Sequence, residues 1–450
     1  MENKLEEVIK KYDSYDYYVK GKIERDTEEN RKGQFVLTFA DKDGNALDGV
    51  SYTVKQKTHE FNFGATTFFL GGFGDERDKL FEEKFTGIFN YGVLPIYWDT
   101  LEPEKGKPRF AKDSAPVYRR PPFDTSVEFC RNNGLRMKAH CLVYNSFQPD
   151  WIPEDTRELK ILIEKRVREI ADRYGNSFVD MDVINEMITV YKNAYPGNGA
   201  RNLPITDEPD HEKWAFELAK KYFPYTNLFW NEGGYETFGD PAYKGNRSFY
   251  YLALRENIAK GAPISGIGMQ YHCYAHRDRA DTELATLCNP LRMLDVFERY
   301  GDFGLPIHIS EINVPSWSND AYDEELQAEL VKRLYKLWFS QKYVKAAVWW
   351  NLADGTAYGS ENKYFGGLIR NDCSAKPAYA ALDKLINHEW RTDICGQTDK
   401  RLDFRGFYGD YEVEAVCGDK KAKTTVRLFT DNTGYNNKFC DFRSKKIVLE

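Results

Sequence analysis

Eight short apolar or β-branched runs recur along the middle of the chain at intervals of roughly 40 residues, with helical patterns such as LKILIEKRVREIADRYG, HEKWAFELAKKY and EELQAELVKRLYKLWFSQK between them. Strands that alternate with helices predict parallel βα units, and eight such units close into a (β/α)8 TIM barrel. We therefore expect an α/β barrel domain over residues 61–390. The runs are FGATTF from Phe63, GVLPIYWD from Gly92, RMKAHCLVYNS from Arg136, DMDVINEM from Asp180, NLFWNEGG from Asn227, GIGMQYHCY from Gly266, IHISEINV from Ile307 and AAVWWNLADG from Ala346.

The two flanks of the barrel region follow a different pattern. Residues 1–34 are rich in charge, and we expect a helical or irregular segment there. Residues 35–60 hold two strand-like runs, FVLTF and VSYTVKQ, around the turn-rich stretch DKDGNALDG. Residues 391–450 also contain short strand-like runs with turns. We expect residues 35–60 and 391–450 to pair into one small β appendage beside the barrel.

Charge and composition narrow the classes of partner. The net charge is −7 and the pI is about 5.7, which argues against nucleic acid or an anionic membrane. The eight cysteines and seven histidines are scattered without zinc spacing, so we expect no metal and no organic cofactor. We also expect a monomer. The dispersed thiols and the lack of an apolar h-region in MENKLEEVIKKY favour the cytoplasm, and a secreted protein remains the alternative if a signal peptide was removed.

The predicted strand ends carry a set of polar side chains. Active sites of such barrels lie at the C-terminal ends of the strands. Glu186 ends the fourth run and Glu311 lies in the seventh, so the two carboxyl groups should face each other across the barrel mouth. The other side chains at these ends are His140, Tyr144 and Asn145 of the third run, Asn185 of the fourth, Gln270 and His272 of the sixth, and Trp350 and Asp354 of the eighth.

Two facing carboxyl groups flanked by amides and aromatic rings suit the cleavage of a glycosidic bond. One carboxyl group protonates the leaving oxygen, and the other attacks the anomeric carbon or activates water. Each residue alone has a plainer interpretation, because a strand-end Glu often forms a salt bridge or cap and a lone His is often a core residue. Asp354 fits a turn as well as a ligand. It is the combination that favours a catalytic site, with Trp350 rather than Trp349 facing the cleft.

These residues and motifs resemble glycoside hydrolase family 10, the endo-β-1,4-xylanase family, from about residue 30 to about residue 410. DVINE is similar to the acid/base motif of that family, HISEINV to its nucleophile motif and KAHCLVYNSFQPDW to its third-strand motif. WDTLEPEKGKPRF, GIGMQYH, VWWNLAD and GGLIRNDCSAKPAYAAL follow in the expected order. ENRKGQFVLTFADKDGNALDGV and FRGFYGDYEVEA look like the β appendages of longer members.

The resemblance implies a role for each matching residue. Glu186 would be the acid/base and Glu311 the nucleophile of a retaining double displacement, with their carboxyl groups roughly 5 to 5.5 Å apart. A raised pKa would keep Glu186 protonated near neutrality while Glu311 stays ionised. The substrate would be a β-linked polysaccharide or oligosaccharide. The residues expected to contact the sugar are His140, Tyr144, Asn145, Asn185, Gln270, His272, Trp350, Tyr358 and Trp98.

Three departures from the family pattern concern residues that would bind the sugar. The second run has Val93, Leu94 and Tyr97 where the family has Glu, Asn and Lys. Tyr144 and Asn145 replace Trp and His of the third-strand motif, and Tyr358 stands in place of a Trp. Three alternatives to ordinary xylanase action therefore stay open: the same chemistry on another β-glycan, an exo mode of attack, and a non-catalytic glycan-binding protein on a xylanase-like barrel.

Overall fold

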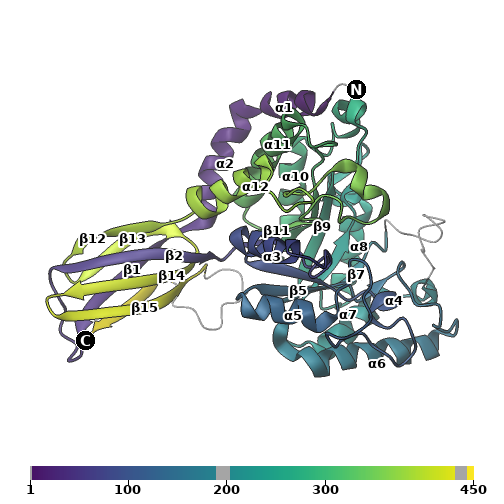
Figure 1. Cartoon of the computed structure of the whole chain (residues 1–450), viewed down its shortest axis with the longest axis horizontal. Coiled ribbons are helices and arrows are strands. Elements are labelled where there is room, and N and C mark those ends of the chain that lie inside the picture. The colour runs from purple at the N-terminus through teal and green to yellow at the C-terminus, as the bar shows by residue number, and fades with distance from the viewer. Residues whose placement is uncertain (1–2, 189–202, 431–442) are drawn as a thin grey trace.

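The computed structural model describes residues 3–188, 203–430 and 443–450, which form two parts that lie side by side (Figure 1). The part on the right of Figure 1 is an α/β barrel, and the part on the left is a β sandwich. The first helices run along the barrel, and the C-terminus lies at the far end of the sandwich. Among the described helices, none combines the length and the apolar character that crossing a bilayer requires.

The barrel confirms the predicted fold class. Each of the eight predicted runs forms one parallel strand, and the sheet closes where Lys138 pairs with Asp180 and Ala139 with Met181. A two-residue strand, β6 (Val143–Tyr144), extends the third run and pairs further along β7. The barrel strands are β3 (Asn62–Thr66), β4 (Tyr91–Pro95), β5 (Arg136–His140), β7 (Asp180–Asn185), β8 (Asn227–Glu232), β9 (Gly266–His272), β10 (Ile307–Asn313) and β11 (Val344–Trp349).

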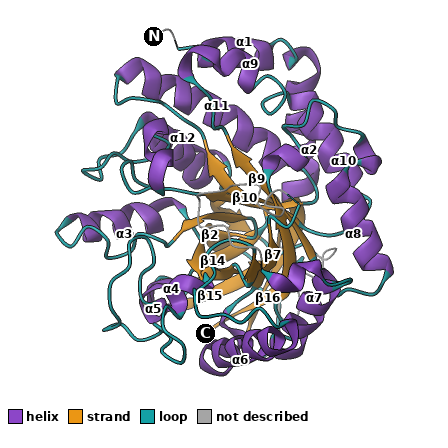
Figure 2. Ribbon diagram, turned by 90° about the vertical axis from the view of Figure 1, so that its right-hand side faces the viewer, coloured by secondary structure: helices purple, strands orange, loops and turns teal. Residues whose placement is uncertain are grey.

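The barrel strands are buried along most of their length because they are covered on both faces. Helices surround the strands on the outside (Figure 2). Buried side chains fill the interior. Every residue of β4, β7 and β10 is buried. Inside the barrel, Phe229 and His308 stack with ring centroids 4.0 Å apart. The interior is therefore a packed core, and only the strand ends are available for chemistry.

The helices between the strands agree with the periodic patterns of the sequence. The α7 helix spans the predicted run HEKWAFELAKKY, and the α6 helix begins after Asp155, whose side chain accepts hydrogen bonds from the amides of Arg157 and Glu158. The helices are α1 (Leu5–Asp13), α2 (Asp16–Arg31), α3 (Arg77–Ile88), α4 (Trp98–Leu101), α5 (Phe123–Asn132), α6 (Thr156–Tyr174), α7 (His211–Tyr222), α8 (Phe249–Ala259), α9 (Ala280–Glu283), α10 (Pro290–Gly301), α11 (Ala321–Ser340) and α12 (Pro377–Asp383).

The β sandwich combines strands from both flanks of the barrel and has a core of its own. One sheet has the order β13-β1-β16 and the other β12-β2-β14-β15. Phe35, Leu37, Val54, Tyr411 and Val413 are fully buried in this second core. Alternation of buried and exposed residues along the strands produces it. The strands are β1 (Lys32–Asp41), β2 (Val50–His59), β12 (Asp393–Thr398), β13 (Arg401–Phe407), β14 (Gly409–Cys417), β15 (Lys420–Leu428) and β16 (Ser444–Leu449).

Arg31 joins the two parts at the point where α2 passes into β1. Its buried guanidinium donates hydrogen bonds to the backbone carbonyls of Phe339, Gln341 and Val344, at the end of α11 and the start of β11. The same group lies over the ring of Phe61, 4.9 Å from its centroid. A charged donor that satisfies three carbonyls in this way fixes the junction against the barrel.

Candidate active site

A cavity of about 610 Å³ opens at the C-terminal ends of the barrel strands. Most of the predicted site residues line it, although they come from five strands and a loop that are far apart in the sequence. The position agrees with the rule that the strand ends of such barrels form the site. The predicted residues in its lining are His140, Tyr144, Asn185, Glu186, Gln270, His272, Glu311, Trp350 and Tyr358.

Glu186 and Glu311 share one hydrogen-bond donor. Nε2 of Gln270 lies 2.6 Å from Oε1 of Glu186 and 3.1 Å from Oε1 of Glu311. Because one nitrogen contacts both oxygens, the distance between the two oxygens cannot exceed the sum of these two contact distances. That upper limit is smaller than the roughly 6.5 to 9.5 Å separation of the carboxyl groups in inverting glycosidases. Oε1 of Glu186 and Oε1 of Glu311 therefore lie close together at one point of the cavity.

Glu186 is held at a turn where the chain leaves β7. Its φ angle is +52°, and its amide donates to the carbonyl of Asn231 at 2.9 Å. Non-glycine residues in this left-handed region are uncommon and gather at functional sites. Burial, and next the negative charge of Glu311, raise the pKa of Glu186, while hydrogen bonds from Gln270 and Tyr144 act in the opposite direction. The net effect favours the protonated carboxyl group that a general acid requires.

Glu311 is surrounded by hydrogen-bond donors. Nδ2 of Asn231 donates to Oε1 at 2.8 Å, and Nε2 of His272 lies 3.0 Å from Oε2. Burial opposes protonation of His272, but the hydrogen bond and charge of Glu311 raise its pKa overall. A histidine whose charged form is favoured in turn stabilises the carboxylate that faces it.

The sequence analysis did not single out Asn231. It is fully buried at the end of β8, and its amide nitrogen also donates to Oδ1 of Asn185 at 2.7 Å. Ser310 donates to its carbonyl oxygen, which orients the amide. The sequence did contain a signal for this residue. Asn231 lies near the end of the fifth run, and the neighbouring runs also carry polar residues near their ends.

His140 belongs to a chain of polar contacts that crosses the barrel mouth. Its Nδ1 lies 2.8 Å from Oδ2 of Asp182, whose other oxygen forms an ion pair with Lys138 at 2.7 Å. Its Nε2 lies 2.9 Å from the hydroxyl of Tyr97 and 3.9 Å from Oε1 of Glu311. Asp182 therefore fixes the imidazole, which presents its other nitrogen to the nucleophile side of the cavity.

Two of the residues expected to contact the sugar lie outside the lining of this cavity. Trp98 starts the short helix α4, is 4% exposed, and donates from Nε1 to Glu102 at 3.1 Å. Asn145 is buried and accepts a hydrogen bond from the amide of Leu203. In the VWWN run, Trp350 lines the cavity, while Trp349 is fully buried and donates to the carbonyl of Gly366.

Comparison with known proteins identifies the family. The sequence model described as Glycosyl hydrolase family 10 matches residues 95–385, which is more than half of the chain. The chain belongs to glycosyl hydrolase family 10. The resemblance inferred from the motifs is therefore confirmed.

Individual relatives in family 10 are distant. Endo-1,4-beta-xylanase 2 of Arabidopsis thaliana is 24% identical over 414 residues, which cover 90% of this chain and 34% of the relative. Endo-1,4-beta-xylanase B of Thermotoga neapolitana is 24% identical over 303 residues, 65% of this chain and 78% of the relative. The chain spans 34% and 47% of the lengths of the Arabidopsis relatives endo-1,4-beta-xylanases 2 and 3. Xylanase 10B from Thermotoga petrophila RKU-1, solved with xylobiose, has a TM-score of 0.56 at 21% identity over 73% of this chain and 95% of that chain, which shows a shared fold.

The second strand of the barrel lacks the polar residues that the resemblance to family 10 implies at its end. Val93 and Leu94 of β4 are buried and apolar. Tyr97, which stands where the resemblance implies a lysine, lines the cavity and contacts His140 through its hydroxyl. Tyr358 is half exposed at the rim, with its ring 5.7 Å from that of Phe147. Tyr97 and Tyr358 thus supply aromatic groups to the cavity, whereas Val93 and Leu94 lie outside its lining.

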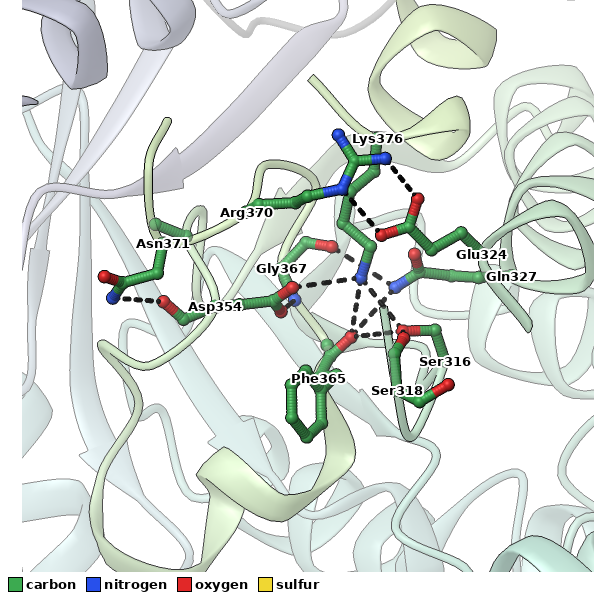
Figure 3. A network of polar contacts seen from close by, with 12 residues as sticks. Ser316, Ser318, Glu324, Gln327, Asp354, Phe365, Gly367, Arg370, Asn371 and Lys376 are labelled. Atoms are coloured by element: carbon green, nitrogen blue, oxygen red, sulfur yellow. Dashed lines mark hydrogen bonds and ion pairs between the residues drawn. The ribbon is translucent and has the colours of Figure 1, made fainter. Parts of the chain in front are cut away.

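Asp354 belongs to a structural network rather than to the cavity (Figure 3). Its carboxylate accepts from the amide of Gly367 at 2.8 Å and from Nζ of Lys376 at 3.3 Å. Lys376 also donates to Ser316 at 3.0 Å and to the carbonyl of Phe365 at 2.9 Å. This Asp354–Lys376 network anchors the long loop after β11, which carries Trp350 and Tyr358 into the cavity.

Two arginines also line the cavity, and the sequence analysis did not predict them. Arg119 and Arg120 lie in the irregular segment between α4 and α5, and both are at least 93% buried. The run SAPVYRRPP has neither strand nor helix periodicity, so no local pattern indicates where its side chains point.

Proposed function

We propose that this chain is a retaining glycoside hydrolase that cleaves β-linked polysaccharide or oligosaccharide by double displacement, with Glu186 as acid/base and Glu311 as nucleophile. The observation that carries the proposal is the single amide of Gln270 held between the two carboxyl groups. The shared donor holds the nearest oxygens of the pair close together, which favours the roughly 5 to 5.5 Å carboxyl separation of retaining enzymes over the wider separation of inverting ones. Family membership supports the same reaction class.

The first step forms a covalent intermediate. A carboxylate oxygen of Glu311 attacks the anomeric carbon, and Glu186 gives its proton to the glycosidic oxygen as the bond to the leaving sugar breaks. Donors from Asn231 and His272 hold Glu311 in place for this attack. Asn185 lies next to the pair and offers its amide to a sugar hydroxyl.

The second step uses Glu186 as a base, and the charges of the pair explain the change of role. The negative charge of Glu311 helps to raise the pKa of Glu186 in the free protein. That charge disappears when Glu311 forms the ester, so the pKa of Glu186 falls and its carboxylate becomes available to accept a proton. Glu186 then takes a proton from the water that attacks the anomeric carbon, and Glu311 is released.

A more specific proposal for the substrate and the mode of attack is endo-β-1,4-xylanase-like action, because the relatives named above are xylanases. Val93 and Leu94 on β4 are buried and apolar where the resemblance implies polar sugar-binding residues, which favours a different β-glycan. A product screen across xylan, arabinoxylan, mixed-linkage glucan and galactan, with analysis of chain length over time, separates these substrates and distinguishes endo from exo attack.

Azide rescue tests the two roles. We expect Glu186→Ala and Glu311→Ala each to abolish turnover of an aryl β-glycoside. Azide should restore turnover in both, with a β-glycosyl azide from Glu186→Ala and an α-glycosyl azide from Glu311→Ala, because only the first variant still forms the covalent intermediate. An unchanged rate in Glu311→Ala contradicts the proposal.

Glu232→Gln is the matched control. Glu232 also ends a barrel strand, but it lies outside the cavity lining and accepts hydrogen bonds from Trp230 and from the amide of Ile188. We expect this variant to remain active. Calorimetric binding of oligosaccharides without release of reducing ends over days would support the non-catalytic alternative instead.

A further inference from the structure

Arg119 and Arg120 place two positive charges in the wall of the cavity. Arg120 lies with its guanidinium carbon 4.1 Å from the centroid of Tyr97 and 5.0 Å from that of Phe68. Arg119 lies 5.6 Å from the centroid of Phe68 and 5.8 Å from that of Trp350. The pair thus borders the aromatic wall formed by Tyr97, Phe68 and Trp350.

This wall surrounds the nucleophile side of the cavity. The ring of Trp350 lies 5.7 Å from that of His140 and 5.8 Å from that of His272, and both histidines approach Glu311. The nucleophile attacks the anomeric carbon of the glycone, the sugar that stays on the enzyme after the first step. The arginine pair is therefore next to the glycone rather than next to the leaving group.

The positive charges of Arg119 and Arg120 have few acidic partners among the described residues. Arg119 has one carboxylate within ion-pair distance, Glu361, at 3.6 Å. Among the ion pairs in the described ranges, none includes Arg120, whose Nη1 donates to the carbonyl of Arg119. Burial raises the pKa of Asp99, and this effect outweighs the charge of Arg120, which acts to lower it. Buried charge of one sign is costly unless a partner of opposite sign is bound.

Three donor atoms of the pair have no hydrogen-bond acceptor although they are buried: Nε and Nη1 of Arg119 and Nε of Arg120. The neighbouring Arg109 shows what a structural arginine of this segment looks like. Its guanidinium donates to the carbonyls of Ala115, Thr100 and Arg120. Arg109 therefore holds the segment together, whereas Arg119 and Arg120 line the cavity and leave these three buried donors without an acceptor.

We propose that Arg119 and Arg120 bind a carboxylate on the glycone, so that the substrate is a β-glycan containing uronic acid. The inference rests on the proposed hydrolase function and adds the substrate class. A planar guanidinium pairs with a carboxylate through two parallel hydrogen bonds, and its contact with aromatic rings keeps the fork oriented. The anion compensates the excess positive charge and takes the place of the polar groups that β4 lacks.

Matched substrates test the proposal. The wild-type protein is assayed with 4-nitrophenyl β-D-glucuronide, the corresponding glucoside and the corresponding 6-sulfoglucoside. Acidic oligosaccharides from glucuronoxylan, native and after reduction of their carboxyl groups to alcohols, extend the comparison to a carboxylate on a more distant sugar. We expect kcat/KM to be at least tenfold higher for the carboxylate form in one of these series, and to fall as NaCl is raised.

Variants of Arg120 test whether this side chain causes the preference for acidic substrates. Arg120→Gln should reduce the ratio of acidic to neutral kcat/KM at least tenfold, and Arg120→Lys should restore only part of it because Lys lacks the planar fork. Arg77→Gln is the control, since Arg77 stacks on Phe73 outside the cavity lining and should leave the ratio unchanged. Circular dichroism checks that each variant is folded.

The outcomes separate the two proposals. Cleavage of neutral glycosides at least as fast as acidic ones, in both series, overturns the carboxylate inference and leaves the hydrolase proposal intact. A preference for the sulfated sugar over the uronide also overturns it. If no glycoside is cleaved, the hydrolase proposal fails, and calorimetric binding of native against carboxyl-reduced oligosaccharides still decides the role of the arginines: equal binding of the two forms contradicts it.

Discussion

The phenol of Tyr144 donates a 2.7 Å hydrogen bond to Oε2 of Glu186, the carboxyl group whose pKa burial raises. This bond favours the carboxylate and holds the pKa lower than burial alone would. We expect Tyr144→Phe to raise the pKa of Glu186 further, because the ring remains and the donor is lost. The alkaline limb of the kcat/KM profile, where the general acid loses its proton, should then move to higher pH.

The pH profile is measured with an aryl glycoside that has a poor leaving group, since only such a substrate needs the acid. A dinitrophenyl glycoside serves as the comparison, because its leaving group departs without protonation and the alkaline limb should be weak in both proteins. A shift of the limb to lower pH in Tyr144→Phe would show that the hydroxyl acts through some other group.

The side-chain nitrogen Nδ2 of Asn231 donates both to the carboxylate of Glu311 and to the side-chain oxygen Oδ1 of Asn185. Removing a hydrogen bond to a charged group costs about 1.5 to 3 kcal/mol, so Asn231→Ala should lower kcat/KM by about ten- to a hundredfold. Asn257→Ala is the control, because that buried amide donates only to the carbonyl of Ala253 in its own helix. Equal losses in both variants would indicate a general effect on folding.

The barrel could be predicted from the sequence because its strands are buried on both faces and separated by regular helices. The run AAVW in β11 therefore stays apolar, directly after the helical pattern of α11. The ends of these runs, in turn, place Glu186 and Glu311 by topology alone, since all parallel strands of a barrel end at one face. The position of these two residues at one cavity needed no knowledge of the loops.

The rest of the cavity is built from segments without a local pattern. Arg119 and Arg120 reach it from an irregular segment whose course depends on contacts such as those of Arg109. Trp98 was expected to face the sugar, but the chain turns into α4 at this residue and directs the indole to Glu102. In both cases tertiary contacts, rather than periodicity, decide the direction of the side chain.

Lys376 is fully buried and forms an ion pair with Asp354 under the loop that carries Trp350 (Figure 3). Burial lowers the pKa of Lys376 and raises that of Asp354, so the attraction between them does not fully offset their desolvation. Lys376→Met leaves Asp354 buried without its cation and should lower the free energy of unfolding by about 3 to 5 kcal/mol. Urea unfolding measures the loss.

The double variant Lys376→Met/Asp354→Asn should regain part of this stability, because no uncompensated charge remains. Lys332→Met is the exposed control: its partner Glu329 is also partly exposed, and the loss should be below about 1 kcal/mol. Equal losses in Lys376→Met and Lys332→Met would mean that burial of the pair has no energetic consequence.

Gly268 of β9 lies directly beside Asn231 and leaves no space for a side chain. A Cβ at residue 268 would be 2.3 Å from Oδ1 of Asn231 and 3.0 Å from its Cα. We expect Gly268→Ala to push Asn231 away from Glu311 and to lower kcat/KM at least tenfold, although residue 268 does not line the cavity. Gly21→Ala, in the α2 helix with no atom within 4 Å of the new Cβ, should instead gain up to about 1 kcal/mol of stability at full activity. Full activity in Gly268→Ala would show that the position of Asn231 does not govern the nucleophile.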